Sequence, residues 1–384
     1  MSIVPEPGGR PTWAEIDLGS FTRNIDHVVS SLPAGSRLIA VLKADAYGHG
    51  AVEVARTCRE DRVAMIATAL LEEALELRRA GIALPLLVLG PLDVHGIRTA
   101  AAARITVGVP GPETLSAACS AARDLEVRIH LKLDSGMGRM GLTAVELPAA
   151  VEMIRSAPGL SLDAIYTHYA NADSVDDPYT GAQDERFRAM LTELRAGGVD
   201  APLHHSANSA AVLRGHVTPG DFVRAGIALY GGDPLGGGTS LEPVMRWRTE
   251  IARLKTLPSG HAIGYGTTFH TKRPSRIATL PVGYADGYNR LHSNRGEVLV
   301  RGRRAPVVGR VSMDLVTIDV TDVPGVAVGD EVMLLGPQGD DRITAEEVAA
   351  RIGTINYEVF CSVSARVPRI YRGEGPVRMR SRFA

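Results

Sequence analysis

The chain has 384 residues, of which 45% are hydrophobic and 22% charged, and its formal net charge is −1 at pH 7. This length allows two or three domains, and the composition is sufficient for a full hydrophobic core. A net charge close to zero gives no electrostatic reason to expect a nucleic acid or an anionic membrane as a partner.

The N-terminus and the cysteines predict a cytoplasmic protein. The first residues lack the basic stretch and apolar run of a signal peptide, and the longest apolar stretch, Ile82–Leu89, is too short to span a bilayer. Cys58, Cys119 and Cys361 are odd in number and widely spaced, which argues against a disulfide framework and a zinc site. We therefore expect reduced thiols, no membrane association and no bound metal.

Short β-type runs alternate with helical patterns from residue 38 to about 230. The predicted strands are Leu38–Leu42, Val63–Ala67, Leu86–Leu89, Ile105–Val107, Val127–Leu133, Ala164–Thr167, Leu203–His205 and Phe222–Arg224. The predicted helices include Leu70–Ala80, Pro112–Asp124, Ala144–Ser156 and Asp184–Ala196. Such alternation indicates parallel βαβ units, and eight of them predict a closed (β/α)8 barrel of the TIM type, preceded by a helix over Leu18–Leu32.

The pattern changes after about residue 243 to short alternating runs separated by Gly, Pro and Asp turns. The predicted strands there are Arg246–Leu257, Arg276–Pro281, Glu297–Val300, Ala305–Val311, Leu315–Val320 and Glu331–Leu335, with one helix near Ala345–Ile352. We therefore predict an α/β protein with a barrel domain over residues 1–243 and a mainly-β domain over residues 244–384, divided near the glycine-rich stretch Gly231–Gly238.

The segment AVLKADAYGHG, residues 40–50, places Lys43 where the first predicted strand gives way to a loop. A lysine that is half-buried at a strand end loses hydration of its ammonium, so its pKa falls and the amine becomes nucleophilic. Those are the properties of a lysine that forms a Schiff base. The segment taken alone is also compatible with a surface lysine that follows a strand.

Other reactive side chains fall at the carboxyl ends of the later predicted strands, where barrel enzymes place their active sites. They are Lys132, Asp134, Arg139, Tyr166, His168, His205, Ser206, Asn208, Ser209 and Arg224. Their convergence on one rim of the barrel predicts an active site.

The segment GMGRMG, residues 136–141, fits the fingerprint of a dinucleotide-binding loop and lies between a predicted strand and a helix. It leaves a nicotinamide-dependent oxidoreductase open as an alternative. The preceding strand carries His130, Lys132 and Asp134 at alternate positions, whereas a doubly wound strand is almost wholly apolar. Arg139 within the glycines would crowd a pyrophosphate and suits a carboxylate clamp instead.

Arg224 lies at the end of the eighth predicted strand. A guanidinium only donates hydrogen bonds and stays charged, so a pyridine nitrogen that faces it cannot be protonated. Arg224 would therefore bind pyridoxal phosphate with its ring nitrogen unprotonated, and the turn of residues 225–227 offers backbone N–H groups for the phosphate. A salt-bridged strand end is the alternative for this residue.

Nine segments in chain order carry a resemblance to a known family. They are AVLKADAYGHG (40–50), HLKLDSGMGRMG (130–141), YTHYANAD (166–173), HSANSAA (205–211), VRAGIALYG (223–231), GYGTTF (264–269), VGYADGYNR (282–290), GRVSMD (309–314) and INYEVFCSVSARVPRIY (355–371). Together with the chain between them, about residues 11–373, they resemble the pyridoxal-phosphate-dependent alanine racemases of fold type III.

The resemblance implies interconversion of L-alanine and D-alanine for peptidoglycan synthesis by a homodimer that shares its active sites. Lys43 would bind pyridoxal 5′-phosphate and act as one base, and Tyr265 of the partner subunit would act as the other. The other cofactor-binding residues would be Tyr47, His168, Asn208, Ser209, Arg224, Gly226, Ile227 and Tyr357. Arg139 and the backbone of Met313 would bind the substrate carboxylate, with Lys132, Asp314 and Tyr284 in supporting positions.

Within that resemblance, His168 would lie between Arg224 and Tyr265, a carbamate on Lys132 would orient Arg139, and Tyr284 would form an inner gate. Positions lining the substrate entrance would be Asp173, Arg290, Arg310 and Ile355. The chain has Asp45 where asparagine is common in the family, Ser312 in place of cysteine and Gly264 in place of serine. A broad-specificity or serine racemase on the same fold is the alternative.

Overall fold

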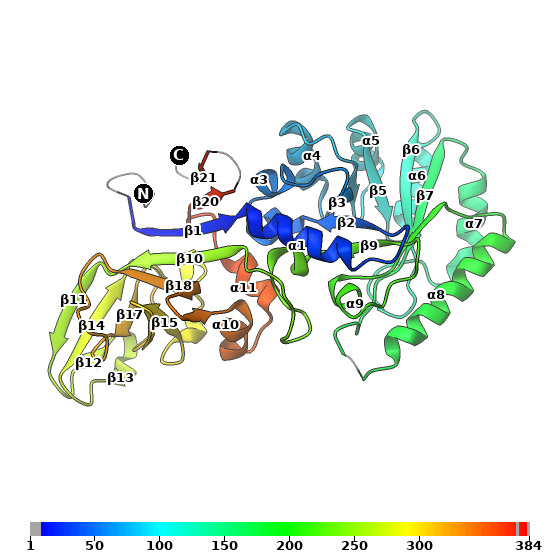
Figure 1. Cartoon of the computed structure of the whole chain (residues 1–384). Helices are drawn as coiled ribbons and strands as arrows, with labels where there is room; N and C mark the ends of the chain where they lie inside the picture. Colours follow the sequence, from blue (N-terminus) through cyan, green and yellow to red (C-terminus); the bar gives the residue numbers. More distant parts are fainter. Residues whose placement is uncertain (1–8, 175, 374–375, 382–384) are drawn as a thin grey trace.

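A closed parallel barrel forms one half of the chain in the computed structural model, which describes residues 9–174, 176–373 and 376–381 (Figure 1). Its strands are β2 (Arg37–Val41), β3 (Val63–Thr68), β4 (Leu86–Val88), β5 (Ile105–Val109), β6 (Val127–Lys132), β7 (Leu160–Tyr166), β8 (Leu203–His205) and β9 (Phe222–Ala225), and β9 pairs with β2 to close it. The prediction of an eight-stranded barrel is confirmed.

Helices and helical turns follow the barrel strands and surround them. They are α1 (Leu18–Ser30), α2 (Lys43–Tyr47), α3 (Ala51–Ala55), α4 (Leu71–Arg79), α5 (Val94–Ala102), α6 (Pro112–Ala121), η1 (Ala144–Glu146), α7 (Leu147–Arg155), α8 (Tyr179–Ala196), α9 (Ser209–Leu213) and η2 (Ile227–Tyr230). Because helices cover its outside and side chains fill its inside, a strand such as β5 is buried at all of its positions. Helix α1 begins after Asp17, whose carboxylate accepts a hydrogen bond from the Ser20 N–H at 2.9 Å.

The second half is mainly β-structure, as predicted, and is built from three sheets. The largest has the order β16-β15-β18-β10-β1-β20-β21 with β19 on β18, and the smaller ones are β11-β14-β17 and the hairpin β12-β13. The strands are β1 (Thr12–Asp17), β10 (Met245–Glu250), β11 (Arg253–Leu257), β12 (Ala262–Ile263), β13 (Phe269–His270), β14 (Ser275–Leu280), β15 (Glu297–Val300), β16 (Arg303–Pro306), β17 (Val316–Asp319), β18 (Glu331–Gln338), β19 (Asp341–Ile343), β20 (Arg369–Arg372) and β21 (Arg378–Arg380).

One strand from before residue 243 joins the second half of the chain. Strand β1, near the N-terminus, lies inside the large sheet of the second half, antiparallel to β10 and parallel to β20 (Figure 1). The sheet needs β1 as a central strand, and Ala14 and Ile16 are fully buried there. The predicted strand Arg246–Leu257 is also divided, because β10 and β11 belong to different sheets.

The remaining helical elements of the second half lie between its strands. They are α10 (Ala345–Ile352), α11 (Asn356–Ser362) and the turns η3 (Tyr265–Thr267), η4 (Tyr284–Asp286) and η5 (Arg290–His292). The predicted helix near Ala345–Ile352 is confirmed. Across the part of the chain that the structure describes, no helix combines the length and the apolar character needed to cross a membrane.

Arg369 joins the two halves from the start of β20. Its side chain is buried, and its Nε donates to the carbonyl oxygen of Gly48 in the barrel at 3.0 Å. Its terminal nitrogens donate to the carbonyl oxygens of Val363, Ser364 and Val367. One guanidinium therefore satisfies four backbone acceptors, and its bond to Gly48 spans 321 residues of sequence.

Replacing Arg369 by methionine is expected to destabilise the fold by about 3 kcal/mol, because the change leaves buried carbonyl groups without a donor. The measurement is the free energy of unfolding in urea. Arg128→Met is the matched control, since the Arg128 side chain is 63% exposed and pairs only at the surface with Asp163. Equal stability of the two variants would contradict the anchoring role.

Candidate active site

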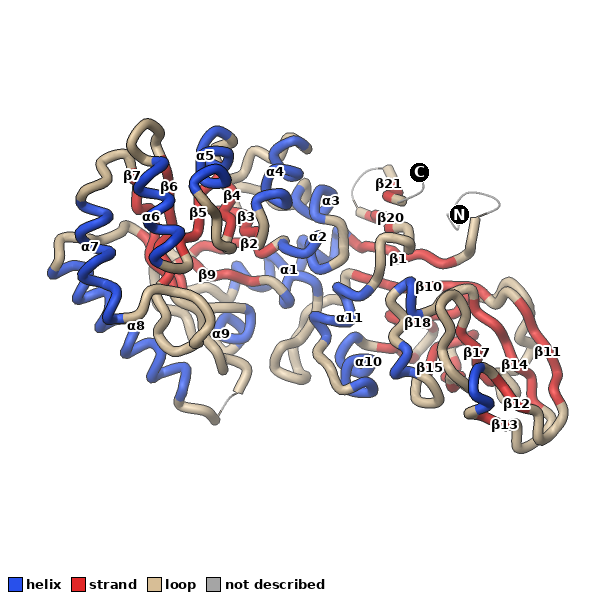
Figure 2. Tube along the Cα trace, turned by 180° about the vertical axis from the view of Figure 1, so that it is seen from behind, coloured by secondary structure: helices blue, strands red, loops and turns tan. Residues whose placement is uncertain are grey.

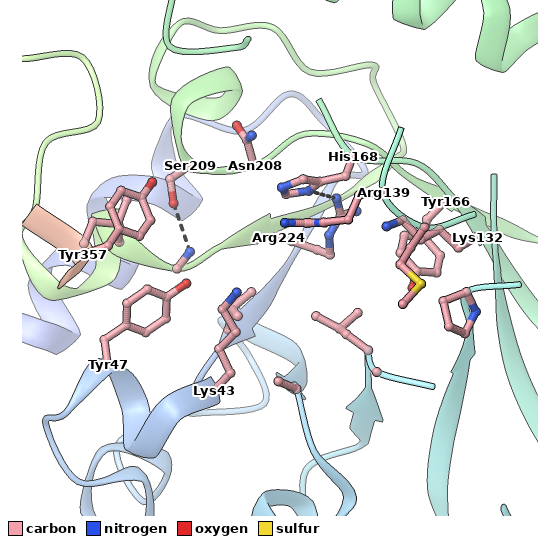
Figure 3. Close-up of a pocket in the computed structure, with 18 of the residues that line it drawn as sticks. Lys43, Tyr47, Lys132, Arg139, Tyr166, His168, Asn208, Ser209, Arg224 and Tyr357 are labelled. Atoms are coloured by element: carbon pink, nitrogen blue, oxygen red, sulfur yellow. Dashed lines mark hydrogen bonds between the residues drawn. The ribbon is translucent and has the colours of Figure 1, made fainter. Parts of the chain in front are cut away.

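A cavity of about 300 Å³ opens at the carboxyl ends of the barrel strands (Figure 3). Four basic side chains line it, those of Lys43, Lys132, Arg139 and Arg224, and no carboxylate is among the 19 described residues around it. Such a set of side chains favours a ligand with several negative charges.

The structure brings eleven of the predicted site residues to this cavity. They are Lys43, Tyr47, Lys132, Arg139, His168, Asn208, Ser209, Arg224, Gly226, Ile227 and Tyr357. Met140, Pro91, Pro110 and Tyr166 also line it, and the sequence had indicated only Tyr166 as reactive. The predicted barrel site is therefore one physical site, while the role of each residue remains a prediction.

Four predicted site residues lie elsewhere in the same chain. Tyr265, Tyr284, Met313 and Asp314 belong to the second half, and none of them lines the cavity. Tyr265 lies between β12 and β13, at the end of the second half remote from the barrel in both views (Figures 1 and 2). Its side chain is 72% exposed, and Met313 and Tyr284 are also exposed. Within one chain, these four residues are therefore not part of the cavity.

Lys43 opens a short left-handed helical segment. Ala44, Asp45, Ala46 and Tyr47 all have φ of 53–54°. Left-handed backbone costs L-residues about 1–2 kcal/mol each, so the four residues store on the order of 4–8 kcal/mol of strain. Strain of this size persists only where the surroundings hold it, and it is typical of functional sites. The Ala44 N–H donates to Glu73 Oε1 at 2.6 Å and so fixes the start of the segment.

The electrostatic surroundings of Lys43 favour its neutral amine. The protein atoms packed around the ammonium lower its pKa, and the positive charge of Arg139 lowers it further. A neutral amine can attack a carbonyl carbon or accept a proton, whereas an ammonium can do neither. The sequence-based expectation about the pKa of Lys43 therefore has a physical basis in the structure.

Arg224 is held at the centre of the barrel end by five acceptors. Its terminal nitrogens donate to the carbonyl oxygens of Thr167, His205 and Ser206 at 2.8–3.1 Å. They also donate to His168 Nδ1 at 3.0 Å and to His205 Nδ1 at 2.6 Å. Burial lowers the pKa of Arg224 to about 10, which leaves the guanidinium charged at neutral pH. Its charge is thus fixed in place rather than mobile.

These contacts settle the proton positions on three histidines, of which His130 and His205 are buried. A guanidinium is a donor only, so His168 and His205 accept at Nδ1 and carry their protons on Nε2. His205 Nε2 then donates to His130 Nδ1 at 3.0 Å, which places the proton of His130 on its own Nε2. Burial lowers the pKa of all three imidazoles, to about 4 for His130, so the chain of rings is neutral.

The opposite side of the cavity is formed by small and hydroxyl-bearing residues. Ser209 Oγ accepts a hydrogen bond from the Gly226 N–H at 2.9 Å, and a Cβ at Gly226 would lie 2.4 Å from the Tyr47 hydroxyl oxygen. Glycine is therefore required at 226 for the Tyr47 ring to reach the cavity. The rings of Tyr47 and Tyr357 lie 6.1 Å apart, and Asn208 caps α9 by accepting from the Ala211 N–H (Figure 3).

The glycine segment of residues 136–141 does not form a phosphate loop. Its backbone N–H groups at Gly136, Met137 and Gly138 all donate to the carboxylate of Asp134, at 2.8–3.2 Å. A carboxylate that already occupies these donors excludes a pyrophosphate from them. The nicotinamide interpretation of this segment is therefore wrong, and the loop serves instead to present Arg139 at the cavity.

The histidine chain behind Arg224 is the part of the site that sequence reasoning missed. His205 was expected among the reactive residues of the rim, but the structure buries it behind Arg224. His130 was noted only for its alternation with Lys132. That alternation, which puts both side chains on the inner face of one strand, was the signal that could have identified it.

Comparisons with known proteins agree over nearly the whole of the chain. Residues 16–234 match the alanine racemase N-terminal domain family, and residues 244–371 match the alanine racemase C-terminal domain family. The alanine racemase of Halothermothrix orenii is 44% identical over 370 residues, covering 95% of this chain and 98% of that protein. The alanine racemase of Desulfovibrio desulfuricans is 42% identical, covering 94% and 98%.

Solved structures show the same relationship. The alanine racemase of Bacillus anthracis with bound L-Ala-P superimposes with a TM-score of 0.91 at 40% identity, covering 98% of this chain and 99% of that one. The biosynthetic alanine racemase of Pseudomonas aeruginosa gives a TM-score of 0.86 at 37% identity, covering 95% and 100%.

Proposed function

The chain belongs to the alanine racemase family of isomerases, and from this premise we propose that it interconverts L-alanine and D-alanine with pyridoxal 5′-phosphate bound at Lys43. One observation carries the proposal. A lysine whose pKa is lowered by burial, a fixed buried arginine and two further basic side chains converge on a single cavity without a carboxylate among its described residues.

The residues of the cavity fit this cofactor. Its phosphate would be held by the hydroxyls of Tyr47, Ser209 and Tyr357 together with the backbone at Gly226 and Ile227, and Asn208 would support that side through α9. Arg224 would face the pyridine nitrogen and keep it unprotonated, because a guanidinium has no acceptor. When bound, pyridoxal phosphate supplies an electron-accepting system that acidifies the Cα proton of an amino acid.

Racemisation removes a proton from one face of Cα and delivers one to the other face, so it is best served by a base on each face. The neutral amine of Lys43 would serve one face. The phenol of Tyr265 from the partner subunit would serve the other, since Tyr265 lies between β12 and β13, and these strands are remote from the barrel of the same chain (Figures 1 and 2). Arg139 and the backbone of the partner's Met313 would bind the substrate carboxylate.

His168 would adjust the second base. Because its Nδ1 accepts from Arg224, its Nε2 carries a proton that it can donate toward the cavity. A hydrogen bond from Nε2 to the oxygen of Tyr265 would stabilise the phenolate, and the fixed charge of Arg224 behind it would act in the same direction. In this arrangement His168 would act on the second base through a hydrogen bond.

The test is chiral chromatography of L-alanine incubated with the cofactor-loaded protein in deuterated water. The expected result is D-alanine that carries deuterium at Cα, because inversion exchanges that proton with solvent. L-Serine, tested in parallel, measures how strongly the site prefers the smaller side chain. Unchanged L-alanine from a protein with bound, yellow cofactor would overturn the proposed substrate.

Carbamate formation on Lys132 is expected to depend on pH. It is buried, and desolvation together with the charges of Arg139 and Arg224 lowers its pKa to about 8. Its neutral amine can therefore attack the carbon of CO₂ near neutral pH, forming a carbamate anion with release of one proton. The neutral fraction decreases about tenfold for each pH unit below this pKa. We expect a ¹³C-carbamate NMR signal in labelled bicarbonate that weakens from about pH 9 to about pH 6.

The control for that measurement is Lys132→Met, which should lack the signal. It should also raise the KM for alanine about tenfold, because Arg139 would lose an oriented anionic partner. The same signal in Lys132→Met would place the carbamate on another amine and contradict this role for Lys132.

The biological setting proposed here follows from the family. The product D-alanine would serve peptidoglycan synthesis in the cytoplasm, where the thiols of Cys58, Cys119 and Cys361, all unpaired, would remain reduced. The active unit would be a homodimer with two shared sites. Exposed apolar side chains in the second half support such a dimer; they include Leu291, Met313 and Leu315.

A further inference from the structure

The left-handed segment that carries Lys43 is held from outside the barrel by the C-terminal end of the chain. Strand β21 pairs with β20 in antiparallel register, with Arg380 opposite Arg369 and Arg378 opposite Tyr371. This hairpin lies beside α2 and α3, because its side chains contact both of them. The family match of the C-terminal domain ends at residue 371, so β21 lies beyond it.

Arg380 makes the most direct contact with the strained segment. Its Nη1 lies 2.7 Å from Asp45 Oδ1 and 2.9 Å from Asp45 Oδ2. Asp45 is itself one of the left-handed residues, two positions after Lys43. The same carboxylate accepts a hydrogen bond from the Ala51 N–H at 2.8 Å, so it also fixes the start of α3.

Three further contacts join β20 and β21 to the barrel residues that follow Lys43. Arg378 forms an ion pair with Glu53 of α3. A Cβ at Gly50 would lie 1.9 Å from the Tyr371 hydroxyl oxygen, so only glycine lets β20 approach the turn so closely. Arg369 adds the buried bond to Gly48 described above.

The side chain at position 45 is matched to Arg380. An asparagine could accept from the Ala51 N–H as well as aspartate does, and it tolerates left-handed backbone. The side-chain amide of asparagine has one acceptor oxygen instead of two. Its NH₂ group would face the guanidinium of Arg380, and two donors cannot hydrogen-bond to each other. A carboxylate satisfies Ala51 and Arg380 together. Aspartate at this position is therefore explained by Arg380.

We propose that β20 and β21 form a clamp on the Lys43 segment, with Asp45 and Arg380 as a matched pair of positioning residues. Neither residue lines the cavity, so neither acts on the reacting atoms. The clamp keeps residues 44–47 in their strained conformation and thereby keeps the Lys43 amine aimed at the cavity. Its effect on turnover rests on the proposed function, whereas its effect on backbone motion does not.

The test is hydrogen–deuterium exchange of the peptide that spans residues 43–51 in the cofactor-loaded protein. We expect Asp45→Asn and Arg380→Gln each to accelerate its exchange about fivefold, the size expected for a partly exposed ion pair. The Arg380 side chain is 52% exposed, so salt should screen the pair and reduce the difference from the wild type at about 0.5 M KCl. Arg380→Lys keeps the charge and should restore most of the protection.

A double-mutant cycle shows whether Asp45 and Arg380 act through their mutual interaction or independently of each other. In the Asp45→Asn/Arg380→Gln double variant, exchange should be no faster than in either single variant, because both remove one interaction. Arg98→Gln is the matched control, since it breaks the similarly exposed pair of Arg98 with Asp124 on the outside of the barrel. It should leave exchange of the 43–51 peptide unchanged.

Turnover supplies a second readout. If the clamp positions Lys43, the Asp45 and Arg380 variants should lower kcat by a similar factor while the KM for alanine and the urea unfolding midpoint stay unchanged. Wild-type exchange in both single variants, or additive effects in the double variant, would overturn the clamp. Failure of the proposed function would remove only the turnover readout and leave the exchange result to decide.

Discussion

Replacing Lys43 by alanine is expected to reduce racemisation by at least about 10⁴-fold, the largest effect of any single change in this chain. The variant loses the nucleophile that would hold the cofactor covalently and also one of the two proposed bases. Borohydride reduction followed by peptide mass spectrometry should attach pyridoxal phosphate to the Lys43 peptide of the wild type. The same treatment should leave that peptide unmodified in the variant.

Lys43→Arg is the informative companion to that variant. Arginine keeps the positive charge and most of the length of the side chain but has no amine that becomes neutral in a protein. We expect it to be as inactive as alanine, which would separate the chemistry of the amine from its charge. Activity of either variant within about tenfold of the wild type would be incompatible with a catalytic Lys43.

Replacing Tyr265 by phenylalanine is expected to reduce racemisation about 10³-fold, within the range usual for loss of a general acid–base group. The side chain is 72% exposed in the single chain, so losing its hydroxyl should not affect folding. Lys43 remains in this variant. We therefore expect one enantiomer of alanine to exchange its Cα proton with deuterated water without inversion, and the other enantiomer to remain unlabelled. Normal racemisation would exclude Tyr265 as a base.

Co-expression of Lys43→Ala with Tyr265→Phe tests whether the two bases come from different subunits. In a mixed dimer, one site combines both defects and the other receives Lys43 from one subunit and Tyr265 from its partner. Random pairing makes half of the dimers mixed, so about a quarter of the wild-type activity should return. If both bases came from the same chain, no dimer would contain an intact site and the mixture would stay inactive.

Local sequence patterns predicted much of the fold. Most of the barrel strands were recognisable because they are short, mainly apolar runs followed by a helical period, as burial on both faces favours. Strand β1 was not among the predicted strands, and its sequence, TWAEID, does not encode which sheet it joins. Its neighbours β10 and β20 are more than 200 residues away, and only packing of the complete sheet selects them.

The left-handed turn after Lys43 shows the same limit at the site. Neither Ala44, Ala46 nor Tyr47 favours positive φ, so residue preferences predict an ordinary loop there. The conformation is imposed by contacts that arrive from elsewhere, from Glu73 after β3 and from Arg380 in β21. The strain belongs to the tertiary structure rather than to the segment.

The sequence by itself determined which chemical groups stand at the strand ends, because the chemistry of Lys43, Arg139 and Arg224 is a property of the side chains and their spacing follows the strand–helix repeat. Only the tertiary structure decided their states and partners. It placed His205 and His130 behind Arg224, and it let the carboxylate of Asp134 accept the N–H groups of the glycine loop. It also placed Tyr265, between β12 and β13, far from the barrel of its own chain. Local periodicity reports which face of an element is buried, whereas protonation, desolvation and the choice of distant partners depend on atoms that meet only when the whole chain is packed.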